Sequence, residues 1–142
     1  MALFRRRTRK PADDAPAPAG PSPERTAELE ARIEALTAKL SEEPSLEEPS
    51  QEEAGTESRI AVLNELGQAC AELGLTDEAI THYEASMALR EQFGPAYNGL
   101  LELYNTKLRE AATLKDDDGI GRWTTRLDDL MALSKRVMRS NY

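Results

Sequence analysis

The sequence predicts an all-α protein, and three observations lead to this fold class. Apolar residues recur at spacings of three and four over most of residues 23–139, as on one face of a helix. Nothing in the chain resembles the alternating pattern of a strand. The motif Leu63-Asn64-x-Leu66 also returns as Tyr97-Asn98-x-Leu100, 34 residues later. A period of this length with helical spacing is typical of stacked helix-turn-helix units.

Residues 1–21 are expected to be a disordered basic arm followed by a Pro/Ala-rich linker. Residues 1–10 contain five positive charges and few apolar side chains. Such a composition does not offset the entropy of ordering, which is about 1–2 kcal/mol per residue. The arm is either a solvated tail or a contact for an anionic membrane surface or nucleic-acid phosphates.

Residues 22–42 are predicted to form a short amphipathic helix. Ser22 is a suitable N-cap, Pro23 suits the first helical position, and Pro44 cannot continue the helix. A coiled-coil-like seam runs along it at spacings of four, three and four, formed by Leu29, Ile33, Leu36 and Leu40.

The seam has two possible partners. Either the helix docks on the following domain as a cap, or two copies pair through the seam as a homodimer. We expect the homodimer, because the linker after the helix is long enough to leave the seam free.

Residues 43–57 are expected to be an acidic linker that is disordered over residues 43–55, and residues 58–139 a domain of four helices. Thr56 or Ser58 is expected to cap the first of them. The first helix should end at Gly74 in a left-handed turn, and the second at Gly94-Pro95. The third and fourth are expected near residues 96–115 and 119–139. The predicted core consists of the large and small apolar residues on one face of each helix: Ile60, Leu63, Leu66, Cys70, Ala79, Ile80, Tyr83, Met87, Tyr97, Leu100, Leu101, Tyr104, Leu108, Ala111, Ile120, Trp123, Leu127, Leu130, Met131 and Val137.

This domain resembles the tetratricopeptide repeat. The first repeat, residues 59–94, matches the family pattern at Leu63, Leu66-Gly67, Gly74, Ala79 and Tyr83. The second is divergent, with Leu101 in place of the glycine and about ten residues inserted before Trp123. The resemblance implies an α-solenoid fragment of two helix-turn-helix pairs that works as a protein-binding scaffold or adaptor for a peptide or protein.

In this family the first helix of each repeat lines the binding face. The residues expected there are mostly amides, which both donate and accept hydrogen bonds and can pair with a peptide backbone. They are Asn64, Gln68, Asn98, Glu102, Asn105 and Arg109. The rival hypothesis is a membrane-surface or nucleic-acid tethered regulator that acts through the Arg-rich arm, residues 1–10.

The sequence gives little indication of catalysis. We expect no enzyme, no cofactor and no metal site, because His82 should be solvated and Cys70 should be a buried structural thiol. The run Asp116-Asp117-Asp118-Gly119 fails the spacing of a calcium loop and fits a turn with a helix cap. The net charge of −8 argues against nucleic acid as a ligand of the folded part. A single cysteine fits a reducing compartment, so the expected location is the cytoplasm.

Overall fold

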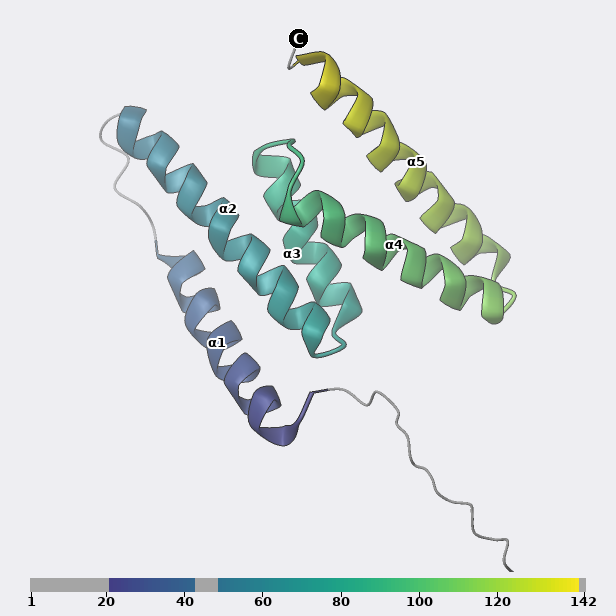
Figure 1. The fold of residues 1–142 in the computed structure, drawn as a ribbon, viewed down its shortest axis with the longest axis horizontal. Coiled ribbons are helices and arrows are strands. Elements are labelled where there is room, and N and C mark those ends of the chain that lie inside the picture. The colour runs from purple at the N-terminus through teal and green to yellow at the C-terminus, as the bar shows by residue number, and fades with distance from the viewer. Residues whose placement is uncertain (1–20, 43–48, 141–142) are drawn as a thin grey trace, which may run out of the picture.

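The computed structural model describes residues 21–42 and 49–140, and these residues form an all-α structure without strands (Figure 1). The five helices are α1 (Pro23–Ser41), α2 (Pro49–Glu72), α3 (Thr76–Leu89), α4 (Pro95–Thr113) and α5 (Asp117–Ser140). Each helix packs against the next, and α2 also contacts α4. Within the described ranges, no helix has the length and apolar character needed to cross a membrane. The basic arm, residues 1–10, lies outside the described residues, so its role stays a prediction.

Helix α1 confirms the sequence prediction at both ends. The backbone N–H of Arg25 donates to Ser22 Oγ at 3.1 Å, so Ser22 caps the helix, and Pro23 occupies its first position. The helix ends at Ser41, and the Glu42 backbone is extended.

Helix α2 begins earlier than the sequence suggested. It starts at Pro49, so residues 49–57 are helical and neither Thr56 nor Ser58 is its cap. Proline favours the first helical position, and an acid near the first turn, such as Glu52, suits the positive end of a helix dipole. The acidic composition was therefore a helix-start signal as well as a linker signal. Residues 43–48 lie outside the described residues.

The connections between the later helices are short and carry the expected turn chemistry. Gly74 has φ of +82°, and the Leu75 N–H donates to the Cys70 carbonyl at 2.8 Å, which ends α2 in a left-handed turn as predicted. Helix α4 ends at Thr113, and Lys115 adopts φ of +56°. Asp116 Oδ1 then accepts from the Gly119 N–H at 3.1 Å, so this acidic run is a helix start, as predicted.

The core agrees with the prediction along most of α2, α3 and α4, and differs where helices meet in unforeseen ways. Met131 was expected inside but is 52% exposed, whereas Leu133 is buried. The reason is the direction of α5, which turns Leu130 and Leu133 toward α4 and α3. Buried residues that the periodicity of the repeat domain missed are Val62, Ala69 and Ala96.

The seam of α1 is covered, which corrects the expectation that it is free. Leu29 is 2% and Leu36 is 9% exposed, and Leu36 packs with Val62 and Leu66 of α2. In the structure, α1 therefore docks on α2 as a cap. Its leucines are not available to a second copy of the chain. Burying them against α2 is more favourable than holding a short isolated seam in water, because a seam of about three turns is marginal alone.

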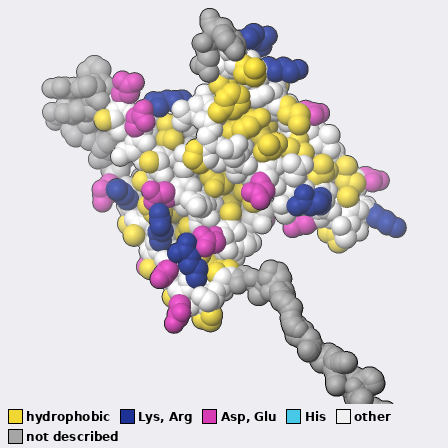
Figure 2. Space-filling model, in the orientation of Figure 1, with side chains coloured by type: hydrophobic (Ala, Val, Ile, Leu, Met, Phe, Trp, Pro, Cys, Tyr) yellow, Lys and Arg dark blue, Asp and Glu magenta, His cyan; other side chains and the backbone are white. Residues whose placement is uncertain are grey.

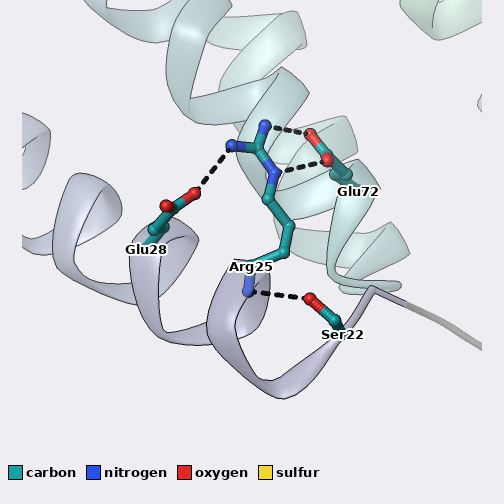
Figure 3. A network of polar contacts seen from close by, with 4 residues as sticks. All are labelled: Ser22, Arg25, Glu28 and Glu72. Carbon is teal, nitrogen blue, oxygen red and sulfur yellow. Dashed lines mark hydrogen bonds and ion pairs between the residues drawn. The ribbon is translucent and has the colours of Figure 1, made fainter.

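Polar contacts also fix the position of α1 along α2 (Figure 3). Arg25 Nε and Nη2 donate to the two carboxylate oxygens of Glu72 at 2.8 and 3.1 Å, and Arg25 Nη1 donates to Glu28 at 3.2 Å. A second cross-helix pair joins Arg32 to Glu65 at 3.1 Å. These groups are solvated, so they select the register of α1 more than they add stability.

Candidate protein-interaction surface

Tyr83 of α3 sets how closely α2 and α4 approach each other. Its ring is 6% exposed and lies between two glycines, Gly67 of α2 and Gly99 of α4. A Cβ at Gly67 would lie 2.7 Å from the ring, and one at Gly99 would lie closer still. Only glycine leaves room for the ring on both sides, so the Tyr83 ring of α3 packs against α2 and α4 at the same time. We call this arrangement the wedge formed by Tyr83. Sequence reasoning identified Gly67 but overlooked Gly99, because the repeat offset aligned Gly67 with Leu101.

Four of the predicted binding residues lie on α2 and α4, two helices that contact each other. On α2, Asn64 is half-buried and Gln68 is exposed; on α4, Asn98 and Glu102 are exposed. Glu102 lies near enough to Tyr83 to raise the pKa of its phenol, after the larger effect of burial. We call Asn64, Gln68, Asn98 and Glu102 the α2–α4 face.

Asn64 is unusual among the described residues. Its Oδ1 is buried and has no hydrogen-bond partner among them. A buried acceptor without a donor costs about 1–3 kcal/mol, so native proteins rarely keep one without a reason. Asn64 is one of the residues predicted from the sequence to lie on the binding face.

The other two predicted residues are less available. Asn105 Nδ2 donates to the Leu101 carbonyl one turn earlier at 2.9 Å, and Arg109 Nη2 donates to Thr106 Oγ1 at 3.3 Å. Helix α4 also leads away from α2 toward its C-terminal end (Figure 1). Asn105 and Arg109 therefore extend the face along α4 without an opposing helix.

Helix α1 limits the α2–α4 face on one side. Gln68 and Ala69 border a cleft between α1 and α2, together with Arg25, Leu29 and Glu72. The docked cap therefore leaves Gln68 at the rim of the face. The position of Gln68 beside α1 could not be predicted from the sequence, because the sequence did not show where α1 docks.

A groove between α3, α4 and α5 is a second feature that sequence reasoning missed. Its volume is about 300 Å³, and its floor contains Met87, Leu100, Leu130 and Leu133. Glu84 Oε2 accepts from Tyr104 Oη at 2.5 Å and from Arg126 Nη1 at 2.7 Å at its edge. Glu84 and Arg126 pair with each other, whereas Asp129, which also lines the groove, has no ion pair among the described residues.

The titratable residues singled out in the sequence lie in the helical interior or beside it. Cys70 is 2% exposed, and burial raises the pKa of its thiol, which confirms a buried thiol. His82 is half-buried rather than solvated, and burial lowers the pKa of its imidazole. Over residues 21–42 and 49–140, no cluster of three or more His, Cys, Asp or Glu side chains has the arrangement of a metal site.

The stability of the protein should fall in alkaline solution. Burial raises the pKa of Cys70, Tyr83 and Tyr104, and for Tyr104 the hydrogen bond to Glu84 adds to the effect. Groups with a raised folded-state pKa stabilise fully below their unfolded pKa, about 8.5 for Cys and about 10 for Tyr, and lose that contribution as pH rises further. We expect the melting temperature to decline as the pH rises above about 8.5, the unfolded pKa of Cys, and to decline further above about 10, that of Tyr.

Thermal melts across that range test this prediction. The variant Tyr104→Phe should be less stable than the parent chain at neutral pH, by about 0.5–1.5 kcal/mol for the lost hydrogen bond. Its alkaline decline should be shallower, because one titrating group is gone. Parallel declines in the two proteins would contradict a raised pKa at Tyr104.

Comparison of the chain with known protein-family models, with curated proteins and with solved structures finds no significant match.

Proposed function

We propose that this chain is a small protein-interaction scaffold of the tetratricopeptide type, which binds an extended or helical segment of a partner protein across the α2–α4 face. The observation that carries the proposal is the set of unused amides on that face. Asn64 has a buried acceptor without a donor, and within the described residues the side chains of Gln68 and Asn98 have no hydrogen-bond partner. Partner backbone groups could supply those hydrogen bonds.

The arrangement of the helices supports the repeat hypothesis. Helices α2 and α3 pack together, as do α4 and α5, and α2 contacts α4 across the wedge formed by Tyr83. In an array of helix pairs, the first helices of successive repeats lie side by side and form one surface. The cytoplasm is the location we propose for this work, because a single buried thiol suits a reducing compartment.

Affinity capture with the full chain tests the proposal. The test variant carries Gln68→Arg and Asn98→Arg, and the matched control carries Ala35→Arg and Thr125→Arg, all at exposed positions. A partner that uses the α2–α4 face should be retained by the parent chain and by the control and lost with the test variant. Equal retention by all three proteins would overturn the assignment of the face.

The rival mode of action is separated by removing residues 1–10. A partner bound through the α2–α4 face is retained by the shortened chain. If binding disappears with the arm and falls steeply with salt, the Arg-rich arm is the active part instead.

Asn64 offers a test that does not need the partner. We expect Asn64→Ala to raise the free energy of unfolding by about 0.5–2 kcal/mol, because it removes an unpaired buried acceptor and adds a better helix former. Urea denaturation measures the change. A loss of stability greater than about 1 kcal/mol would show that the amide is already bonded in the free protein, and would remove it from the binding face.

A further inference from the structure

The outward side of α5 carries a stripe that no described helix covers. Its members recur at alternating spacings of four and three, which places them on one side of the helix, and all are exposed: Asp117, Gly121, Thr124, Asp128, Met131, Lys135 and Met138. We call this set the α5 stripe. Met131 is 52% and Met138 is 51% exposed, and they are the two large apolar side chains of the stripe. Figure 2 shows Lys and Arg side chains at the C-terminal end of α5, and the largest group of hydrophobic side chains on the side of α5 that faces α3 and α4.

The two arginines of α5 that border the groove are paired within the chain, Arg126 with Glu84 at 2.7 Å and Arg136 with Glu91 at 3.2 Å. Asp129 borders the same groove and has no ion-pair partner among the described residues. Asp128 and Lys135 lie on the α5 stripe, and neither has an ion-pair partner among residues 21–42 and 49–140. Besides Asp117 at the start of α5, the stripe therefore carries one negative and one positive charge that have no ion pair within the described residues.

These two charges complement each other under a two-fold rotation. Asp128 and Lys135 lie on either side of Met131, at distances of three and four residues along the helix. If two α5 helices pack antiparallel about an axis near Met131, Asp128 of each copy lies near Lys135 of the other. Parallel packing would instead set like charges opposite each other, which is unfavourable.

The opposite end of the molecule does not offer a complementary surface. Helix α1 closes that end and directs its leucines toward α2, and none of its large apolar residues is exposed. Head-to-tail stacking would therefore place the methionines on a polar helix. In a two-fold symmetric contact between two α5 helices, the stripe of each copy covers the stripe of the other.

We propose that two copies of this chain form a homodimer through antiparallel packing of their α5 stripes. Met131 and Met138 supply the apolar contact, for which flexible methionine side chains are well suited. The pairs formed by Asp128 and Lys135 set the antiparallel direction. A contact along one helix buries less than the roughly 1,200–2,000 Å² of a standard interface, so the dimer should be weak and dependent on concentration.

Sedimentation equilibrium of the full chain, from micromolar to millimolar concentration, tests the proposal. The parent chain should pass reversibly from monomer to dimer. Met131→Glu should raise the dissociation constant by about tenfold or more, because it buries a carboxylate in the contact. Thr125→Glu, an exposed position on the same helix turned roughly 100° from Thr124, should leave the dissociation constant unchanged.

A charge exchange provides the sharper test. Asp128→Lys alone and Lys135→Asp alone should each weaken the dimer, and the double variant D128K/K135D should restore it. Circular dichroism confirms that each variant is folded. A parent chain that stays monomeric at millimolar concentration would overturn the proposal, as would a dimer that the Met131→Glu variant leaves intact. A double variant as weak as either single variant would overturn the antiparallel direction.

Discussion

Replacing Trp123 with alanine is expected to lower the free energy of unfolding by about 3–5 kcal/mol, the usual range for a buried large aromatic. The indole is 9% exposed and lies 5.8 Å from the Tyr104 ring, centroid to centroid. The Arg126 guanidinium lies 5.1 Å from the centre of its ring and also binds Glu84. Loss of the ring would leave a cavity between α4 and α5 and remove a cation–π contact of about 0.5–1 kcal/mol.

Urea denaturation followed by circular dichroism measures this change. The control is Trp123→Phe, which keeps an aromatic ring and should cost distinctly less than the alanine variant. A midpoint that barely moves in Trp123→Ala would mean that the ring contributes little to the packing of α4 and α5.

Replacing Gly99 with alanine is the second substitution with a large expected effect. We expect it to lower the free energy of unfolding, although alanine usually stabilises a helix. Alanine is normally the better helix former by about 1 kcal/mol, so an isolated helix would gain stability. Here the new methyl group would meet the Tyr83 ring, which Gly67 of α2 confines on its other side. Overpacking of this kind costs about 1–3 kcal/mol, so we expect a net loss.

Gly121 is the matched control for this prediction. It lies in α5, and a Cβ added there meets no atom within 4 Å. Gly121→Ala should therefore raise stability by about 0.5–1 kcal/mol, measured at a concentration where the chain is monomeric. If Gly99→Ala is stabilised to the same extent as Gly121→Ala, the wedge formed by Tyr83 is not rigid.

Helical periodicity predicted most of the architecture, because the pattern of apolar residues determines which face of each helix turns inward. Leu63, Leu66 and Cys70 were placed correctly on this basis, as was the left-handed turn at Gly74. The prediction failed at Pro49, where acidic residues that suit the start of a helix also suit a linker. Local composition alone does not separate those two cases.

The docking of α1 and the packing of Tyr83 depend on contacts between residues far apart in the sequence. The seam of α1 was recognisable, but its partner was not, because a leucine seam fits another copy as well as the neighbouring helix. Gly99 was missed for a related reason: its role depends on a side chain of a different helix. Of the predicted binding residues, four lie on the contacting helices α2 and α4 and remain a predicted face, whereas Asn105 and Arg109 bond within α4.

The most direct test of the α2–α4 face is amide chemical-shift mapping of the full chain with the captured partner segment. Binding there predicts the largest shift changes at Asn64, Gln68, Asn98 and Glu102, with small changes along α1 beside Gln68. It also predicts that the side-chain amide signals of Asn64 move on binding. Shift changes confined to α5 or to residues 1–10, with the α2–α4 face unchanged, would contradict the account.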